Sequence, residues 1–495
     1  MRIGDLLVAA RLVKPEDIDA ALKRQLASGG RLGESLVALG VIKAETLDDF
    51  LNQVPPVPTS LKETGIDAAE LLNLLLKIIL VRGTETVSSF SEAIRLPRKI
   101  VSELLDQAVA SQFLQVLGSM GTSGLDDLRY AFTEKGRKWA NEALAMSGYA
   151  GQAPVSLAEY SDRILRQKVT NETISWPRIQ SAFEGLDITE AFIDQIGPAV
   201  RSGRATLLYG PAGNGKTSVA QRLGHVFSSV VYIPHAVMIE GQIMRVFDPN
   251  LHQPIADSRV ADQPVGQSVV TPAITLRRED FDMRWVPCRR PFVVAGGELT
   301  LEMLDLRHEP AANFYEAPLH IKASGGCLLI DDFGRQLVSP TALLNRWIVP
   351  LENRMDYLKL HTGKSFGLPF EALVIFSTNL EPADLMDPAF LRRIPYKLEV
   401  GGPSRDAFRR IFEKISKSQG LPFSDDVFDY IVSELEKRGT ELANYQPKFL
   451  IDQIIAACGF KETAPQFDRK LVNYAISNLS VRRSQGQQRT TLAKV

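Results

Sequence analysis

The chain has 495 residues, and its 57 Lys and Arg against 58 Asp and Glu leave a formal net charge of −1. Such a balance argues against a protein that coats nucleic acid or an anionic membrane through bulk charge. Hydrophobic residues make up 45% and charged residues 23% of the chain, which excludes global disorder. A chain of this length predicts about three folded domains.

Cysteine spacing and hydropathy indicate the compartment. The three cysteines lie far apart and form no CxxC spacing, which predicts a reducing environment. Asp5 and Arg11 interrupt the apolar core that a signal peptide would need. The densest apolar run, residues 71–81, contains Lys77 and is shorter than the roughly 20 residues that span a bilayer. We therefore expect a cytoplasmic protein without membrane insertion, in which this run forms a buried helix.

An internal repeat opens the chain. Residues 2–25 align without gaps with residues 31–54, across the spacer LASGG. In each copy a Leu/Val-rich helix is followed by a Lys-x-Glu turn and a second helix. Units this short cannot bury an apolar face alone, so we expect the copies to pack together as a small α-helical domain, residues 1–54. A Pro-rich linker, residues 54–60, follows.

The next predicted unit, residues 61–145, reads as three helices, a hairpin with a Gly/Ser tip and a last helix, which is the order of a winged-helix domain. It contains ten basic and eleven acidic side chains. A DNA-binding module normally has a basic face, so protein docking or a spacer role is favoured over nucleic-acid binding. A linker and a helix, residues 146–180, lead into a large α/β region.

A phosphate-binding motif lies at residues 207–220, LLYGPAGNGKTSVA, which matches GxxxxGK[ST] between an apolar strand and a helix. Glycines allow backbone N–H groups at a helix N-terminus to close around phosphate oxygens. Lys216 is suited to neutralise the β- and γ-phosphates, and the Thr217 hydroxyl to ligate Mg²⁺, so ATP and Mg²⁺ are the predicted cofactors. The predicted nucleotide-binding residues are Gly210, Pro211, Ala212, Gly213, Asn214, Gly215, Lys216, Thr217 and Ser218.

Polar residues follow two further apolar strands. The strand in GGCLLIDDFGR ends in Asp331, which we expect to hold Mg²⁺ through water, and in Asp332, which we expect to polarise the attacking water. The strand in ALVIFSTNL ends in Asn379, which is placed to orient that water beside the γ-phosphate. Farther along, Arg392 and Arg393 end a short helix, and a cation that enters a neighbour's site can stabilise transition-state charge.

The order of these parts, followed by a helical tail, resembles the AAA+ ATPase superfamily over about residues 180–465. The resemblance implies a multidomain α/β fold in which the C-terminal segments are a P-loop α/β core at residues 181–400, an α-helical lid at residues 401–480 and a flexible tail at residues 481–495.

The resemblance also implies a role for each motif. Residues 210–217 correspond to Walker A, Asp331 and Asp332 to Walker B, Asn379 to sensor 1, and Arg392 or Arg393 to the arginine finger. Lys448 stands where the family more often has the nucleotide-contacting arginine of sensor 2. Asp332 stands where Glu is more frequent, but some initiator and helicase-loader branches also carry an Asp pair, so hydrolysis is expected to survive.

The segment from Thr217 to Asp331 is about twice as long as a minimal core of this family needs, with the excess around residues 245–310. Long loops in compact domains usually carry function. Two interpretations stay open: the insertion carries a substrate or partner surface, or it is a hairpin that only pads the fold.

The tandem repeat resembles the MshEN domain, the N-terminal domain of type II secretion and type IV pilus ATPases. That resemblance implies binding of cyclic di-GMP, because arginine can stack on guanine and glycine lets the backbone approach. Arg11 replaces the second glycine of the first copy, and Val54 the glutamine of the second. A pure docking module is the alternative. The implied ligand-binding residues are Arg2, Gly4, Gln25, Arg31, Gly33 and Gly40.

These patterns together predict a cytoplasmic, Mg·ATP-hydrolysing AAA+ remodelling ATPase that acts on an unidentified protein substrate. The resemblance implies a homo-oligomeric ring, a hexamer being one such ring, with sites completed between subunits and control by a cyclic di-GMP sensor. Analogy alone suggests work on a pilus or secretion assembly. The alternatives are a winged-helix DNA-binding regulator with ATP-driven assembly, and a nucleotide-gated scaffold that binds ATP without turnover.

Overall fold

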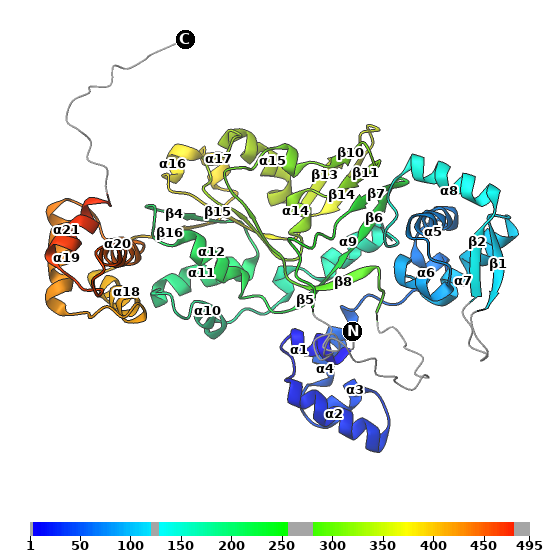
Figure 1. The fold of residues 1–495 in the computed structure, drawn as a ribbon, viewed down its shortest axis with the longest axis horizontal. Coiled ribbons are helices and arrows are strands. Elements are labelled where there is room, and N and C mark those ends of the chain that lie inside the picture. The colour runs from blue at the N-terminus through cyan, green and yellow to red at the C-terminus, as the bar shows by residue number, and fades with distance from the viewer. Residues whose placement is uncertain (1–2, 120–127, 256–280, 480–495) are drawn as a thin grey trace, which may run out of the picture.

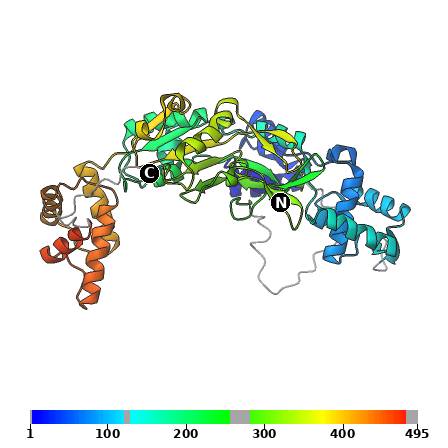
Figure 2. The same ribbon diagram turned by 90° about the horizontal axis from the view of Figure 1, so that it is seen from above.

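A computed structural model describes residues 3–119, 128–255 and 281–479. The molecule is elongated, with residues 405–477 at one end, residues 68–146 at the other and the β-sheets between them (Figures 1 and 2). Within the described residues, no helix combines the length and the apolar character needed to cross a membrane.

Four helices form the N-terminal repeat: α1 (Ile3–Ala9), α2 (Pro15–Ser28), α3 (Leu32–Ala38) and α4 (Ala44–Asn52). Equivalent glycines allow close packing in the two copies, because Gly4 lies against Ile18 and Gly33 lies against Leu47. The two copies share one cluster of buried apolar side chains, which includes Leu6, Leu7, Leu36 and Phe50.

Residues 68–146 form three helices, an antiparallel hairpin and a fourth helix: α5 (Ala68–Arg82), α6 (Val87–Ile94), α7 (Arg98–Ala110), β1 (Leu114–Ser119), β2 (Leu128–Phe132) and α8 (Glu134–Met146). Asp67 and Thr86 cap α5 and α6, since their side chains accept hydrogen bonds from the first turns. Most apolar side chains of α5 are buried, as its sequence predicts. The predicted Gly/Ser tip lies in residues 120–127, outside the described residues.

The central sheet has five parallel strands in the spatial order β16–β4–β15–β12–β9. The strands are β4 (Thr206–Tyr209), β9 (Phe292–Ala295), β12 (Cys327–Ile330), β15 (Leu373–Ser377) and β16 (Tyr396–Glu399). From β4 the chain crosses to β9 at one edge of the sheet and returns through β12 to β15, beside β4. It then forms β16 on the other side of β4. A parallel sheet brings the carboxyl ends of all its strands to one edge.

Helices cover both faces of the central sheet (Figure 1). Leu328 and Ile330 pack with α14 (Leu319–Lys322), α15 (Pro340–Asn353), α16 (Pro382–Leu385) and α17 (Pro388–Leu391). Cys327 and Leu329, which alternate with them, pack with α10 (Trp176–Ala182), α11 (Glu190–Ser202) and α12 (Lys216–Gly224). Burial on both faces explains why these strands are almost continuously apolar in sequence. The predicted multidomain α/β architecture is confirmed, and the structure shows that its central sheet is parallel.

A second, mixed sheet lies beside the central one, in the order β10–β11–β7–β6–β3. Its strands are β3 (Val155–Ser156), β6 (Ala236–Ile239), β7 (Gln242–Arg245), β10 (Arg307–Glu309) and β11 (Phe314–Glu316). Helix α9 (Leu157–Arg166) follows β3. Two antiparallel pairs complete this region: β5 (Val230–Pro234) with β8 (Trp285–Arg289), and β13 (Met355–Lys359) with β14 (Ser365–Pro369).

The extra residues between Thr217 and Asp331 differ from the predicted insertion at 245–310. Strand β9 falls inside that range but is an edge strand of the central sheet. The additional strands also begin earlier, at β5, and β6 pairs with β3 from the predicted linker. The sequence pattern is ambiguous because strands of three to five residues have the same apolar character in either sheet, and only their pairing assigns them. Residues 256–280 of the predicted insertion lie outside the described residues.

The C-terminal bundle consists of α18 (Arg405–Ser418), α19 (Asp425–Lys437), α20 (Gln446–Phe460) and α21 (Arg469–Ser477). Its core is separate from those of the sheets and is rich in aromatic and branched side chains, including Phe408, Phe412, Ile431, Leu450, Ile454 and Val472.

A buried arginine ties the N-terminal segments to the middle of the molecule. The Arg284 side chain is 1% exposed and forms ion pairs with Asp282 and with Glu159 of α9. It also donates hydrogen bonds to the carbonyl oxygens of Thr64, at 2.7 Å, and Pro154, at 3.2 Å. A buried guanidinium needs such partners because its desolvation is otherwise uncompensated. Segments that precede and follow residues 68–146 therefore bind the same guanidinium group, that of Arg284.

A second buried network surrounds Glu172, between α9 and α10. Its carboxylate pairs with Arg290 at 3.1 Å and with Arg178, and it accepts hydrogen bonds from the backbone N–H groups of Ser228 and Ser229. Burial alone would raise the pKa of Glu172, but the positive charge of Arg290 and these hydrogen bonds outweigh it and lower the pKa to about 2. The ionised carboxylate therefore stabilises the folded chain.

Glu172→Gln should lower the free energy of unfolding at pH 7 by about 3 kcal/mol, because it leaves buried arginines without their counter-charge. The wild-type contribution is present above the ordinary carboxyl pKa and is lost as the pH falls toward about 2. Urea unfolding across this range should therefore give a flatter pH dependence for the variant. Glu184→Gln, at an exposed position, is the matched control and should change stability by less than about 0.5 kcal/mol. Equal effects of the two substitutions would contradict the assignment.

Candidate nucleotide-binding site

The phosphate loop, residues 210–217, connects the carboxyl end of β4 to the start of α12. Gly210, Gly213 and Gly215 all have positive φ angles, of 129°, 83° and 87°. Glycine adopts such angles without strain. At Gly210 an added Cβ would also lie 2.7 Å from the carbonyl oxygen of Val400. Because β4 lies where the strand order reverses, the loop occupies the edge where open α/β sheets bind ligands.

Lys216 is the buried cation of the loop, with 6% of its surface exposed. Its Nζ donates hydrogen bonds to the carbonyl oxygens of Gly210 and Pro211, both at 2.9 Å. Burial lowers the pKa of Lys216, while the charges of Asp332 and Asp331 act in the opposite direction. The remaining predicted residues differ in accessibility: Asn214 is buried, whereas Pro211, Ala212 and Ser218 are exposed.

Thr217 and Asp331, the two predicted magnesium ligands, lie in direct contact. The Thr217 hydroxyl donates a 2.8 Å hydrogen bond to Oδ2 of Asp331, which directly follows β12. The Asp331 N–H donates to the carbonyl oxygen of Ala295 at the end of β9, which holds the residue at the sheet edge. A hydroxyl and a carboxylate are the oxygen donors that Mg²⁺ prefers, so this pair fits the ion.

Asp332 and Asn379 form the next contact along the same edge. The Asn379 Nδ2 donates a 3.1 Å hydrogen bond to Oδ1 of Asp332. Asp332 is exposed and has a φ of 48°, an uncommon angle for a residue other than glycine. Such outliers persist where the surrounding structure holds them, and they cluster at functional sites. The structure thus brings the loop, both acids and the asparagine together from three strands.

Two supporting residues were not predicted from the sequence. Thr378 donates its hydroxyl to the carbonyl oxygen of Phe333 at 2.8 Å, which joins the end of β15 to the segment after Asp332. Gln336 donates to the carbonyl oxygen of Asp331 at 2.9 Å. The sequence indicates Thr378 only by its position, because it directly precedes Asn379 at the end of an apolar strand. Both bonds hold backbone beside the acidic pair.

The C-terminal bundle also contacts the phosphate loop, through two residues that no local sequence pattern predicted. The Tyr445 N–H donates to the carbonyl oxygen of Gly213 at 3.1 Å, and the Asn444 side chain donates to that of Asn214 at 3.0 Å. Lys448, predicted to bind nucleotide, lies one helical turn beyond Tyr445, and its exposed Nζ pairs with Asp452 at 2.6 Å.

Arg392 and Arg393 lie near the amino ends of the central strands, directly before β16, whereas the phosphate loop follows the carboxyl end of β4. Arg393 donates to Glu352 at 2.6 Å and to the carbonyl oxygen of Ala389 at 2.9 Å, whereas Arg392 is exposed. Both line a surface pocket of about 660 Å³, together with Ser202, Arg204, Leu351, Glu352, Ala389, Pro395 and Tyr396. Within one chain, these arginines are therefore separated from the phosphate loop by the length of β4.

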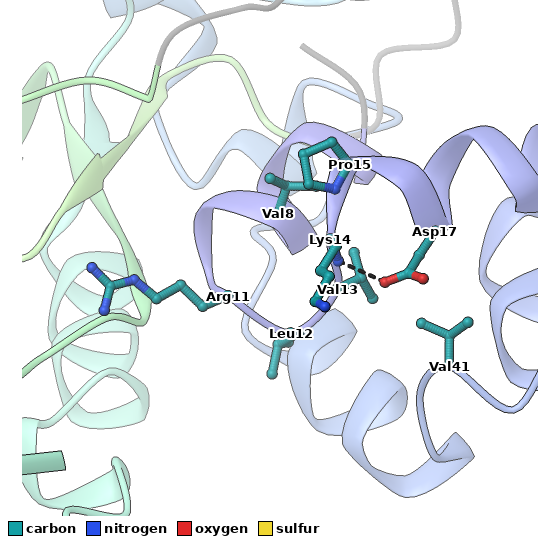
Figure 3. A pocket seen from close by; sticks show the side chains of 8 residues that line it. All are labelled: Val8, Arg11, Leu12, Val13, Lys14, Pro15, Asp17 and Val41. Carbon is teal, nitrogen blue, oxygen red and sulfur yellow. Dashed lines mark hydrogen bonds between the residues drawn. The ribbon is translucent and has the colours of Figure 1, made fainter.

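A second pocket, of about 410 Å³, lies in the N-terminal repeat (Figure 3). Arg11, which has a φ of 56°, occupies the position equivalent to Gly40, whose φ is 71°. The replacement therefore keeps the turn but places an arginine there, and Figure 3 shows its side chain extending away from the other lining residues. The pocket is lined by Val8, Arg11, Leu12, Val13, Lys14, Pro15, Asp17 and Val41.

The residues implied to bind cyclic di-GMP do not line this pocket. Gly4 and Gly33 lie within helix contacts, and Gly40 is exposed in a turn. The side chain of Gln25 donates to the carbonyl oxygen of Gly30 at 2.9 Å. Arg31 is exposed beside α3, and Arg2 lies outside the described residues.

Comparisons with known proteins give limited matches. A family model described as a domain of unknown function (DUF8689) matches residues 404–478, which span α18–α21. No curated protein matches the chain. Among solved structures, NtrX from Brucella abortus is similar with 13% identity and a TM-score of 0.36, over 60% of this chain and 56% of that one. A mutant of RuvB from Thermotoga maritima has 13% identity and a TM-score of 0.31, over 63% of this chain and 73% of that one. This chain thus covers little more than half of the NtrX chain.

Proposed function

We propose that the chain is a Mg²⁺-dependent ATPase of the AAA+ type, which hydrolyses ATP to ADP and phosphate. The observation that carries the proposal is the pair of contacts at one sheet edge: Thr217 with Asp331, and Asn379 with Asp332. Phosphate-loop proteins use a hydroxyl and a strand-end carboxylate for the metal, and a further polar group for the attacking water. The strand order supports the same interpretation, because the loop lies where that order reverses.

Each residue of the site has a separate chemical task. The backbone N–H groups at the start of α12 bind phosphate oxygens, and Lys216 exchanges its two carbonyl partners for the β- and γ-phosphates. Thr217 and Asp331 hold Mg²⁺, which when bound neutralises charge on the phosphates. Asp332 accepts the proton of the water that attacks the γ-phosphorus, and Asn379 holds the Asp332 carboxylate in place. The bond to the leaving ADP oxygen then breaks.

Turnover is favoured over a scaffold that only binds ATP. A scaffold needs the phosphate loop and the metal ligands but not a second carboxylate. Here Asp332 is exposed, carries an unusual backbone angle and is held by Asn379. A carboxylate whose position is fixed by a dedicated hydrogen-bond partner fits a catalytic group.

We further propose that the active form is a homo-oligomeric ring in which a neighbouring subunit supplies the finger. Arg392 is the better candidate, because Arg393 is already engaged with Glu352 and with a backbone carbonyl. The separation of both residues from the loop of their own chain fits a cation that acts on the next subunit. An arginine in trans stabilises the charge that develops on the transferred phosphoryl group.

The regulatory part of the proposal concerns the N-terminal repeat, which we propose binds cyclic di-GMP and thereby adjusts ATP turnover. Its support is the tandem sequence pattern together with the exposed side chain of Arg31. A protein substrate in a pilus or secretion assembly is proposed by analogy with the domain that the repeat resembles. Lys448 would take part in nucleotide binding only after leaving Asp452.

Lys216→Ala should abolish ATP binding, because the buried cation for the β- and γ-phosphates is lost. Asp332→Asn should bind ATP with nearly wild-type affinity but hydrolyse it at least 100-fold more slowly, because only proton acceptance is removed. Calorimetry with ATP and a phosphate-release assay measure the two steps. Equal loss of binding in both variants, or full activity of Asp332→Asn, would contradict the assigned roles.

Mixing Arg392→Ala with Lys216→Ala should restore part of the ATPase rate that each variant lacks. In mixed rings, some interfaces pair an intact loop with an intact finger. Arg393→Ala is the matched control: if Arg393 only pairs with Glu352, it should retain most of the wild-type rate. Absence of recovery at any ratio, with mixed oligomers demonstrated by mass spectrometry, would favour a site completed within one chain.

Arg31→Ala in the full chain should weaken cyclic di-GMP binding at least tenfold, because it removes a group that stacks on guanine and pairs with phosphate. Arg24→Ala, at an exposed position that is not among the residues implied to bind the ligand, is the control. Calorimetry measures affinity, and the ATPase rate with and without ligand measures regulation. No heat at millimolar ligand would reduce the repeat to a docking module and leave the ATPase proposal unaffected.

A further inference from the structure

The segment that enters α20 lies directly on the phosphate loop, although 230 residues separate the two in sequence. The Tyr445 N–H donates to the carbonyl oxygen of Gly213 at 3.1 Å. Asn444 makes two contacts with Asn214: its Nδ2 donates to the backbone carbonyl oxygen at 3.0 Å, and its N–H donates to the side-chain Oδ1 at 3.3 Å. Two consecutive carbonyl groups of the loop are thus bound by the C-terminal bundle.

Peptide geometry gives these contacts a consequence for phosphate binding. In a trans peptide the C=O of one residue and the N–H of the next lie in one plane and point in opposite directions. A bundle that holds the carbonyl of Gly213 therefore turns the N–H of Asn214 away from itself. The hydrogen bond from Asn444 to the carbonyl of Asn214 likewise turns the N–H of Gly215 away from the bundle. Backbone N–H groups of this loop are the donors that a phosphate needs.

The surroundings keep this arrangement close and ordered. Gly213 has a φ of 83°, and an added Cβ there would overlap the ring of Tyr445, so only glycine allows the approach. Asn214 is 3% exposed, which shields its hydrogen bonds from water. On the bundle side, the buried Gln446 accepts from the N–H of Ala443 at 3.1 Å and donates to the carbonyl oxygen of Glu441 at 2.8 Å. The segment that presents Asn444 is therefore braced before it meets the loop.

We propose that Asn444 is a positioning residue for the nucleotide: by binding the Asn214 carbonyl it orients the loop N–H groups toward the phosphates. This inference rests on the proposed ATPase function and assigns a task to residues 404–478, which match a domain of unknown function. Because the contact is made by neutral amides, it links the bundle to the nucleotide without a charged side chain.

The test compares Asn444→Ala, Asn444→Asp and Asn478→Ala in the full chain. Asn478 is an exposed asparagine of the same bundle that donates to Gln453 at 3.0 Å, so it controls for loss of an amide contact elsewhere. Asn444→Asp keeps the size of the side chain but removes the donor to the carbonyl oxygen. The probes are a fluorescent ADP analogue for affinity, steady-state ATPase rates, and thermal unfolding.

Both substitutions at Asn444 should weaken ADP binding about tenfold and raise KM for ATP by a similar factor, with kcat changed less than about threefold. Asn478→Ala should leave affinity within about twofold of wild type. Wild-type affinity in Asn444→Asp would show that only side-chain volume matters and would overturn the proposal, as would equal weakening by Asn478→Ala. Thermal unfolding distinguishes a folding defect from the local effect. A wild-type chain that binds no ADP would refute the ATPase proposal itself, which is a separate outcome.

Discussion

Parallel strand pairing is the constraint on which the candidate site depends. Strands β4, β12 and β15 run in one direction, so their carboxyl ends meet at a single edge of the sheet. The pairing places Thr217 and Asp331 within hydrogen-bond distance across 114 residues of sequence. The intervening residues supply the edge strand β9 of this sheet, the β5–β8 pair and most of the second sheet without disturbing this register. The candidate site therefore depends on the edge of the central sheet, and the strands of the second sheet are free to serve another purpose.

Local sequence predicted most of the residues that the structure brings together at the candidate site. The phosphate loop could be predicted because glycine, lysine and threonine at fixed spacing each meet a separate geometric or chemical need. Asp331, Asp332 and Asn379 could be predicted because polar residues at the ends of apolar strands converge in a parallel sheet.

Contacts that depend on docking could not be predicted in this way. Asn444 and Tyr445 precede a helix far along the chain, and no local pattern shows which surface that helix meets. Strand β9 has the apolar character of its neighbours, so only its pairing with β12 assigns it to the central sheet. The glycines of the repeat illustrate a different ambiguity: Gly4 and Gly33 suit close approach, and in the structure the approaching groups are Ile18 and Leu47.

The burial of Arg284 bears on how such a chain can be shortened or recombined. Its acceptors come from both sides of residues 68–146, so a cut that removes residues 1–67 also removes the Thr64 carbonyl. A guanidinium that is 1% exposed would then lose one of its acceptors and keep Asp282, Glu159 and the Pro154 carbonyl. A shortened or recombined chain should therefore keep the segment around Thr64 together with the segment around Arg284. Exchange of the front end between related chains would require a compatible residue at the receiving position.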